Sequence, residues 1–177
     1  MPETTEYFRY LHPHLTVLVT CGKGDERNII TVAWHMPISV DPPLLGISVA
    51  HRRHSHGLIR RYREFVVNVP ALDIISKVHR CGSVSGRDVD KFSDTGLTPA
   101  ESSAVSVPSI MECPVSMECR LEAEHDLGDH TLFVGRVVHI RKNDEMYDGT
   151  LLKEEHSWIG HLGRNVYIDR WGRIHRE

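Results

Sequence analysis

Residues 115–124 alternate apolar and polar side chains without a break, and this pattern constrains the fold more than any other stretch. The apolar members are Val115, Met117, Cys119, Leu121 and Ala123. A period of two places them on one face of a strand, which is typical of an antiparallel strand with one buried face. Residues 127–130 have turn composition. Residues 131–140 then follow as the partner strand, with Gly135 as a bulge or a point of close approach.

Apolar and β-branched segments earlier in the chain predict four more strands, at residues 14–21, 29–34, 44–50 and 65–69. The second of these is expected to stop before His35, because Pro37 withholds a donor from the sheet ladder and restricts the residue before it. Asp41, Pro42 and Pro43 have the composition of a turn. These strands are therefore expected to be joined mostly by short connections.

Two helices and a helical turn are predicted between the strands. Ser55 is a candidate N-cap for the first helix, because its hydroxyl can accept a hydrogen bond from a backbone N–H of the first turn. Residues 71–80 are amphipathic and predict the second helix. Residues 88–96 are expected to contain a short helical turn that ends at Gly96.

Six or seven strands with two inserted helices favour a mainly β fold, an antiparallel β-barrel decorated with helices. A doubly wound fold is not expected, because strands and helices do not alternate and no glycine-rich dinucleotide fingerprint follows the first strand. Residues 81–87 are expected to form a small-residue loop, and residues 98–108 an irregular, serine-rich segment. The chain length predicts a single domain, residues 1–177.

Composition narrows the classes of partner. The formal net charge of −3 gives no global attraction to nucleic acid. No apolar run is long enough to span a bilayer, and the first ten residues lack the apolar core of a signal peptide, so a cytoplasmic location without a membrane partner is expected. The four cysteines have no Cys-x-x-Cys spacing, which favours buried free thiols over disulfides or a zinc site.

Two segments offer groups for an anionic ligand. Residues 52–55, Arg-Arg-His-Ser, place positive charge and a hydroxyl before a predicted helix, where free backbone N–H groups favour phosphate. Residues 82–87 contain glycines that permit close approach, and Ser85, Arg87 and Lys91 can face anionic oxygens. From composition alone, the first segment is more often a solvated basic turn, and the second is as often a flexible connection.

Other chemical groups are less informative. Trp34 ends a predicted strand, where a lone indole more commonly belongs to the core than packs on a planar ligand. Histidines are close in sequence at two places, namely His12 with His14, and His51 with His54 and His56. No carboxylate or cysteine pattern completes a ligand set, so no metal site is expected. No Ser–His–Asp or Cys–His set stands out, and redox chemistry would require a bound organic cofactor.

Several motifs occur together in a fixed order. They are NIITVAW at residues 28–34, PIS at 37–39, DPP at 41–43, RHS at 53–55, FVVNVP at 65–70, SGRDVDKF at 85–92, GDH at 128–130, FVGRV at 133–137 and HLG at 161–163. Together they resemble the flavin reductase-like proteins, which bind FMN on a split β-barrel. This family includes flavoredoxins, ferric reductases and reductase components of two-component monooxygenases. The chain looks most like the flavoredoxin and ferric-reductase branch, where FMN is held tightly.

The resemblance implies a role for each matching residue. The isoalloxazine ring would be lined by Asn28, Thr31, the backbone of Ala33 to His35, and Trp34, with Val49 and Ala50 beneath the ring or the ribityl chain. The phosphate would be held by Arg53, His54 and Ser55. The site would be closed by Ser85, Gly86 and Lys91. His130 would reach the flavin edge or the nicotinamide, as the one catalytic residue assigned.

The resemblance also implies an activity. This is an FMN-binding oxidoreductase that takes electrons from NADH or NADPH and passes them to a flavin, a ferric chelate or a redox protein, as a homodimer with the flavin near the interface. Two alternatives remain open: a non-enzymatic FMN-binding electron carrier, and a histidine-rich metal-binding or structural protein. Ser55 and Lys91 are expected at exposed positions, so replacing both with alanine is expected to weaken FMN binding and leave the fold intact.

Overall fold

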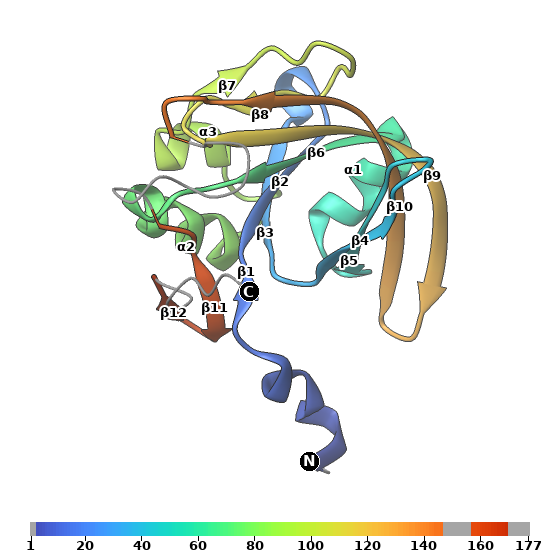
Figure 1. Ribbon diagram of the computed structural model, residues 1–177, viewed down its shortest axis with the longest axis vertical. Helices are drawn as coiled ribbons and strands as arrows, with labels where there is room; N and C mark the ends of the chain where they lie inside the picture. The colour runs from blue at the N-terminus through green and yellow to red at the C-terminus, as the bar shows by residue number, and fades with distance from the viewer. Residues whose placement is uncertain (1–2, 147–156, 170–177) are drawn as a thin grey trace, which may run out of the picture.

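The computed structural model describes residues 3–146 and 157–169. A seven-stranded antiparallel sheet forms its centre, in the order β3-β2-β6-β9-β10-β5-β4 (Figure 1). Its strands are β2 (Val17–Cys21), β3 (Asn28–Val32), β4 (His35–Ser39), β5 (Leu44–Ala50), β6 (Glu64–Val69), β9 (Val115–Leu127) and β10 (His130–Lys142). The long β9–β10 hairpin is the one that the alternating pattern predicts.

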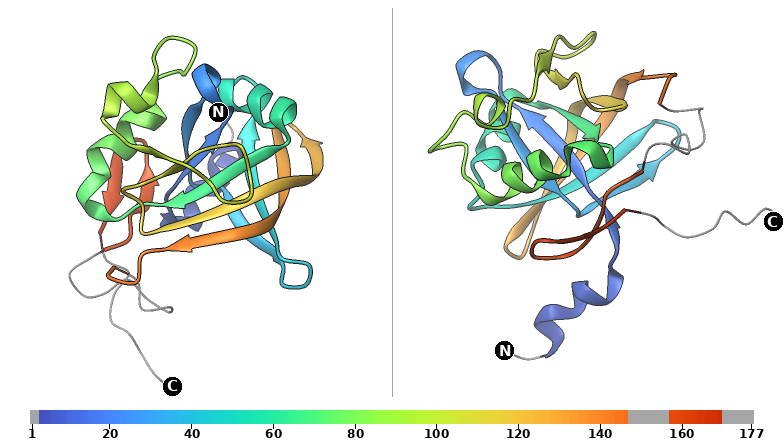
Figure 2. Two further views of the ribbon diagram at one scale, coloured as in Figure 1. Left: turned by 90° about the horizontal axis from the view of Figure 1, so that it is seen from above. Right: turned by 90° about the vertical axis from the view of Figure 1, so that its left-hand side faces the viewer.

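The sheet curls on itself. β3 and β4 lie at its opposite edges, yet only Ala33 and Trp34 separate them in sequence. The two edges must therefore approach each other, and Figure 2 shows the sheet rolled into an open barrel. The Ser48 N–H donates to the carbonyl oxygen of Trp34 at 2.9 Å and fixes this connection against β5. The predicted mainly β barrel with inserted helices is confirmed.

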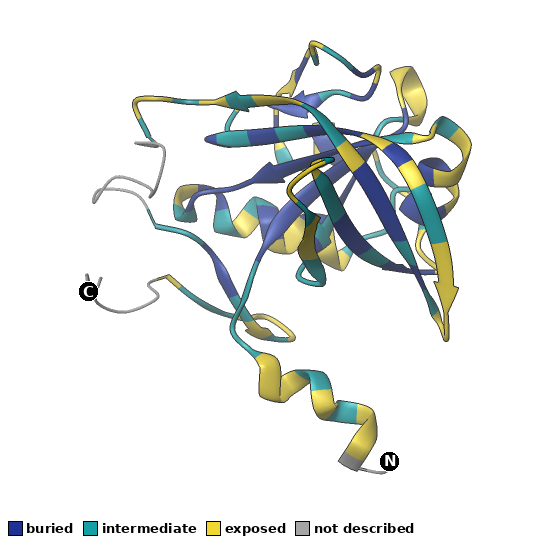
Figure 3. Cartoon of the chain, turned by 45° about the vertical axis from the view of Figure 1, so that its right-hand side comes forward, coloured by how far each residue is buried: buried dark blue, intermediate teal, exposed yellow. Residues whose placement is uncertain are grey.

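Two smaller sheets and six helical segments complete the described structure. The small sheets are β1 (His14–Leu15) with β11 (Gly160–Gly163) and β12 (Val166–Ile168), and β7 (Pro99–Ala100) with β8 (Ser109–Ile110). The helices are α1 (His54–Tyr62), α2 (Ile75–Ser83) and α3 (Lys91–Thr95), with 3-10 turns η1 (Glu3–Leu11), η2 (Gly24–Glu26) and η3 (Leu72–Ile74). η1 projects from the barrel and is largely exposed (Figure 3).

The alternation of β2 divides the core into two layers. Val17 and Val19 pack inside the barrel, together with Leu58 and Ile59 of α1. Leu18, which lies between them, faces the opposite side, where residues of α2 and α3 cover the sheet. Burying apolar side chains on both faces of β2 stabilises the fold by roughly 1.5–3 kcal/mol for each large side chain. Helices therefore cover both faces of the sheet, and the site lies among these elements.

Gly135 is a confirmed bulge position. The register of β9 and β10 shifts between Val134 and Gly135. A Cβ at Gly135 would lie 2.5 Å from Cζ of Phe65 and 2.9 Å from Cβ of Cys119, so only glycine lets β10 approach the core here. The four cysteines are free and buried, as predicted.

The strand before Pro37 stops before His35 as predicted, since β3 ends at Val32. A further strand, β4, then contains Pro37 and was not predicted; it lies at the sheet edge, where the missing N–H of a proline is tolerated. Two local predictions are wrong. α2 continues to Ser83, so the segment expected to be a loop from residue 81 begins as helix. The N-cap residue of α1 is Arg53, whose side chain makes no capping hydrogen bond. Ser55, the predicted N-cap, lies inside the first turn of the helix.

Candidate functional site

Two adjoining cavities lie between β3, β5, α1 and α2. Cavity 1 has a volume of about 600 Å³ and cavity 2 a volume of about 340 Å³. Arg52, Arg53, Gly82 and Ser83 line both of them, so the cavities share a wall. Cavities of this size are typical of small-molecule and cofactor sites.

The predicted site residues divide between the two cavities. Cavity 1 is lined by Thr31, Ala33, Trp34, Val49, Ala50 and His130. Cavity 2 is lined by Asn28, His54, Ser55, Ser85, Gly86 and Lys91, and Arg53 lines both. Asn28 therefore lies with the groups expected to hold the phosphate, and not with those expected to surround the ring.

His35 is the one predicted site residue outside both cavities. Its Nε2 lies 2.8 Å from the carbonyl oxygen of Leu15, and its side chain lines a third cavity of about 330 Å³. The resemblance assigned a role to the backbone of this residue and not to its imidazole. The imidazole instead links β4 to β1.

Cavity 2 is strongly cationic. Arg52, Arg53, Arg87 and Lys91 line it, and no aspartate or glutamate of the described chain lines either cavity. The pKa of His54 is lowered, first by burial and then by the neighbouring Arg87 and Lys91, so His54 offers an N–H rather than a full charge. In a chain with a formal net charge of −3, this concentration of cations indicates an anionic ligand.

Lys91 is buried, with 4% of its surface exposed, although an exposed position was expected. Its ammonium donates to the carbonyl oxygens of Ile29 at 2.8 Å and Cys81 at 2.6 Å. Burial lowers the pKa of Lys91. An ammonium has three N–H donors, so one remains for a ligand in cavity 2. Lys91 therefore joins β3 to α2 and faces the cavity at the same time.

Ser55 is also buried, with 2% of its surface exposed, so the expected exposed position is wrong here too. Its Oγ accepts a hydrogen bond from Nδ2 of Asn28 at 2.8 Å. Oδ1 of Asn28 is buried and has no partner among the described residues. A Cβ on Gly86 would overlap this oxygen, so the absence of a side chain keeps the space in front of it open. An unpartnered buried acceptor beside an open cradle fits a polar ligand.

Aromatic rings form one wall of cavity 1. Trp34 stacks on His130 with ring centroids 4.9 Å apart and an interplanar angle of 30°. Phe8 of η1 meets Trp34 edge-on at 5.5 Å. Trp34 is half-buried and lines the cavity, so the interpretation of this residue as core is wrong. Nδ1 of His130 lies 2.7 Å from Oδ1 of Asp129, which holds the imidazole at the end of the β9–β10 turn.

Sequence reasoning missed the far side of cavity 1. Residues from the N-terminal segment and from β11–β12 line it, namely Phe8, Arg9, His12, Thr16, His161, Leu162, Gly163, Arg164 and Tyr167. The HLG motif was a signal for part of this group, but no role was attached to it. The pairing of β1 with β11, including His14 with His161, brings these distant segments together.

Thiol chemistry is not supported at this site. Burial raises the pKa of Cys81, which lines cavity 2, to about 11, and the pKa of nearby Cys21 to about 12. Both therefore remain protonated at neutral pH and are poor nucleophiles.

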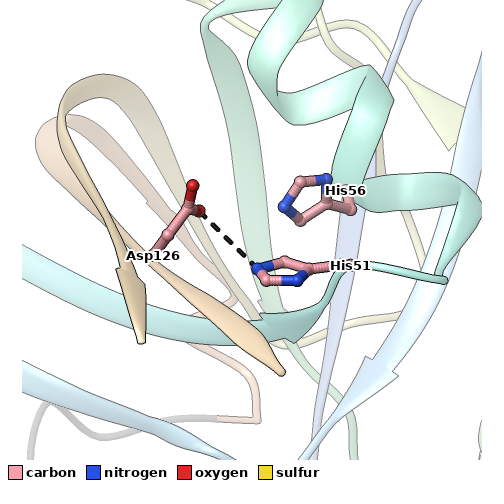
Figure 4. A group of neighbouring side chains, drawn as sticks. All are labelled: His51, His56 and Asp126. Carbon is pink, nitrogen blue, oxygen red and sulfur yellow. Dashed lines mark ion pairs between the residues drawn. The ribbon is translucent and has the colours of Figure 1, made fainter. Parts of the chain in front are cut away.

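One of the predicted histidine groups does form a cluster. Figure 4 shows His51, His56 and Asp126, whose ligand atoms lie within 4.8 Å of one another. Nε2 of His51 is 3.6 Å from Oδ1 of Asp126. The carboxylate comes from β9, far along the chain, which local spacing does not reveal. His54 does not join the cluster and lines cavity 2.

Hydrogen bonds already occupy His56 and Asp126 of this cluster. Nε2 of His56 lies 2.7 Å from Oγ1 of Thr131, which donates to Oδ1 of Asp126 at 2.5 Å. Arg60 donates to the same Oδ1 at 2.7 Å. The bonds from Thr131 and Arg60 lower the pKa of Asp126 to about 2. A metal ion would compete with a guanidinium for this oxygen, so we interpret the cluster as a link between α1 and the β9–β10 hairpin.

Acid is expected to destabilise the fold through buried histidines. Burial lowers the pKa of His35, His56 and His161. The unfolded chain protonates them near pH 6.5 and the folded chain only at lower pH. Their contribution to stability is therefore complete above about pH 6.5 and is lost as the pH falls through the lower folded values. The free energy of unfolding, measured by urea denaturation, is expected to be smaller at pH 5 than at pH 7.5.

A variant checks the source of this pH dependence. Gln at position 35 keeps an N–H for the carbonyl oxygen of Leu15 but does not titrate in this range. His35→Gln is expected to reduce the slope of the unfolding free energy against pH, by at most about 1.4 kcal/mol for each pH unit, because one group binds at most one proton. An unchanged slope would remove His35 from the explanation.

Comparison with known proteins identifies the family. The model of the flavin reductase like domain matches residues 9–157. This chain belongs to that family. An uncharacterized protein of Archaeoglobus fulgidus is 40% identical over 147 residues, covering 83% of this chain and 82% of the relative. An uncharacterized protein of Pyrococcus abyssi is 35% identical over 171 residues, covering 97% of this chain and 98% of the relative.

Solved structures agree with the predicted fold. An FMN-binding protein from Thermus thermophilus with bound p-hydroxybenzaldehyde has a TM-score of 0.87 and 28% identity, over 100% of this chain and 95% of that one. Flavoredoxin of Desulfovibrio vulgaris (Miyazaki F) is 22% identical, with a TM-score of 0.83 over 93% of this chain and 91% of that one. At this identity, the likeness supports the fold alone. The predicted family and split-barrel fold are confirmed, and FMN is the cofactor that the Thermus protein is named for. Within residues 3–146 and 157–169, every helix is too short or too polar to cross a membrane.

Proposed function

We propose that this protein binds FMN across cavities 1 and 2 and uses it to pass electrons from NADH or NADPH to an acceptor, which is a flavin, a ferric chelate or a redox protein. The difference in lining between the two cavities supports this proposal. One cavity is cationic, the adjoining one is walled by stacked rings, and neither contains an acidic side chain of the described chain. A phosphate tail and a planar ring require these two environments in this order.

Cavity 2 would hold the phosphate. Arg53 and Lys91 supply charge, and the first turn of α1 presents backbone N–H groups that have no acceptor within the helix. A phosphomonoester carries a charge of about −1.5 to −2 at pH 7, which these groups neutralise. Gly86 would let the ligand approach Asn28, whose Oδ1 can accept from a ribityl hydroxyl.

Cavity 1 would hold the isoalloxazine ring. Val49 and Ala50 of β5 are buried and form an apolar floor. Thr31 donates to the carbonyl oxygen of Val78 at 2.6 Å, which fixes α2 against β3 at the side of the cavity. Trp34 and His130 offer flat faces at the open end. The chain orients the ring and excludes water from one face of it.

The chemistry of the proposed reaction belongs to the ligands. When bound, FMN would supply two-electron redox chemistry between a reduced nicotinamide and an acceptor. The chain contributes position and charge, as the cations of cavity 2 would hold the tail. His130, held by Asp129, would contact the ring edge or the nicotinamide.

We also propose a homodimer. The exposed apolar residues include Tyr10 and Leu11 of η1 and Met36, Ile38 and Val40 of the β4–β5 hairpin. Val40 is 94% exposed, and together with Met36 and Ile38 it adds apolar surface to this hairpin. A second chain covering η1 and β4 would place cavity 1 beside the interface. A monomer mass in light scattering would contradict this proposal.

The electron donor is tested by an anaerobic titration. The FMN-loaded protein is mixed with NADH or NADPH, and the flavin absorbance is followed. Bleaching by one or both nicotinamides is expected. A flavin spectrum that persists with both, while dithionite bleaches it, would instead identify an electron carrier that binds no nicotinamide.

A further inference from the structure

The far end of cavity 1 contains charge that the FMN phosphate does not need. Arg52, Arg53, Arg87 and Lys91 all line cavity 2, and they outnumber the charges on one phosphate. Arg9 and Arg164 line cavity 1 only. No carboxylate pairs with Arg164 in the part of the chain that the structure describes, while Arg9 is paired with Glu6 at 2.8 Å on the exposed side of η1.

Buried donors at the same end also lack acceptors. Both ring nitrogens of His12 and Oγ1 of Thr16 are buried without a hydrogen-bond partner among residues 3–146 and 157–169. Whatever its tautomer, a neutral imidazole carries one N–H, so His12 has a donor to give, as does the Thr16 hydroxyl. His12 and Thr16 both line cavity 1. Buried donors are normally satisfied, so this pair indicates a ligand with acceptor oxygens.

His161 completes the group. Its ring centroid is 5.4 Å from that of His12, and its Nε2 lies 3.2 Å from the carbonyl oxygen of Arg164. This contact links the imidazole of His161 to the backbone of Arg164, whose guanidinium carries the positive charge of the group. Arg164 has φ of 52°, a left-handed conformation that favours glycine, although an arginine occupies it. The backbone at this position would be more relaxed with glycine, which makes Arg164→Gly a substitution that the fold tolerates.

We propose that His12, Thr16, His161 and Arg164 form a subsite for an oxyanion, a phosphate or a carboxylate, on the second reactant that meets the flavin. This proposal rests on the proposed function only in naming FMN as the flavin. The subsite itself is inferred from the residues that line cavity 1. Two sources share this chemistry: the phosphates of NAD(P)H, and the carboxylates of an acceptor such as a ferric chelate. Arg164 pairs with the anion, and His12 and Thr16 donate to it.

Redox-inert anions test the subsite in the FMN-loaded full chain. NADP⁺, NAD⁺ and citrate are titrated separately, and the flavin difference spectrum gives each affinity. At least one probe is expected to bind, with an affinity that falls about tenfold between about 20 mM and about 300 mM NaCl, because screening weakens exposed charges. A response to NADP⁺ or NAD⁺ identifies the donor as the source, and a response to citrate alone identifies the acceptor.

Substitutions at position 164 separate binding from stability. Arg164→Gly is expected to lower the affinity for the responding probe about tenfold, while the thermal midpoint stays the same or rises because glycine relaxes the left-handed backbone. Arg164→Lys should stay within about threefold of the wild type, since it keeps the charge. Arg136→Gln is the control, because Arg136 pairs with Glu122 on β9 and lines neither cavity. Equal affinity in the wild type and Arg164→Gly would overturn the subsite, as would a failure of all three probes to bind.

The subsite and the flavin proposal can fail separately. If the protein takes up no FMN, the proposed function fails. The same three anions are then titrated into the FMN-free chain, and the thermal midpoint is measured. Stabilisation that Arg164→Gly loses and Arg136→Gln keeps would still support the subsite. Stabilisation that is equal in both variants would contradict it.

Discussion

Lys91→Met is expected to lower FMN affinity about 10- to 100-fold and to destabilise the fold. The third N–H of the ammonium would donate to the phosphate, and a hydrogen bond to a charged group is worth roughly 1.5–3 kcal/mol. The carbonyl oxygens of Ile29 and Cys81 would also lose their donor. Methionine fills similar space and avoids burying a charge, so the net loss of stability is expected to be about 1–3 kcal/mol.

Lys77→Met is the matched control for this variant. Lys77 contacts the carbonyl oxygen of Gly96 at 3.0 Å at an exposed position, and it lines neither cavity. The FMN affinity of Lys77→Met, measured by fluorescence quenching, should equal that of the wild type. Equal FMN affinity in Lys91→Met would contradict the assignment of cavity 2 to the phosphate, and an unchanged thermal midpoint would contradict the structural role of Lys91.

Gly86→Ala is expected to weaken FMN binding by about 10- to 100-fold with a smaller effect on the fold. The new methyl group would overlap Oδ1 of Asn28, which cannot swing away freely because its Nδ2 is held by Ser55. Overpacking of this kind typically costs about 1–3 kcal/mol, and here it falls where the ligand must approach. Apparent FMN affinity and the urea midpoint, measured on the same preparation, separate the two effects.

Gly57→Ala is the control for Gly86→Ala. Gly57 lies inside α1, and a Cβ there would meet no atom within 4 Å. Alanine is expected to stabilise the helix by up to about 1 kcal/mol, with FMN binding unchanged. If Gly86→Ala binds FMN as tightly as Gly57→Ala, then the Asn28–Gly86 cradle is not part of the cofactor site.

Much of the barrel was predictable from periodicity. The strand at residues 115–124 and the Gly135 bulge follow from strand geometry, and the structure has both. The predicted exposed face is wrong at Ser116 and Glu118, which are buried. Residues 44–50 also form the strand expected, as β5. Strand β4 was not predicted, because only the sheet order shows that Pro37 lies in an edge strand, where proline is tolerated.

The site was predictable only in part. The resemblance supplied Arg53, Ser55 and Lys91, which converge on cavity 2. The burial of Ser55 and Lys91 was not predicted, since basic and hydroxyl residues are usually exposed and only the packing of α1 and α2 on β3 encloses these two. The far side of cavity 1 depends on pairing between β1 and β11, which no local pattern specifies. The same is true of Asp126, which joins His51 and His56 from a distant strand.

The double replacement of Ser55 and Lys91 by alanine now has a different expected outcome. Both residues are buried, so loss of FMN binding in the double variant would be mixed with loss of stability. The single methionine and alanine variants above, each with its control, replace it as tests of the site.

The segment at residues 98–108 is held against β9, because Glu118 accepts hydrogen bonds from the backbone N–H groups of Ser103 and Ala104. None of these residues lines cavity 1 or cavity 2.

The central claim is that this chain holds FMN in cavities 1 and 2. The most direct test is the visible absorption spectrum of the purified full chain, recorded before and after addition of FMN and removal of unbound flavin. We predict a flavin spectrum with about one FMN for each chain, since cavities 1 and 2 together form one site for it. A protein that stays colourless after incubation with excess FMN would contradict the claim.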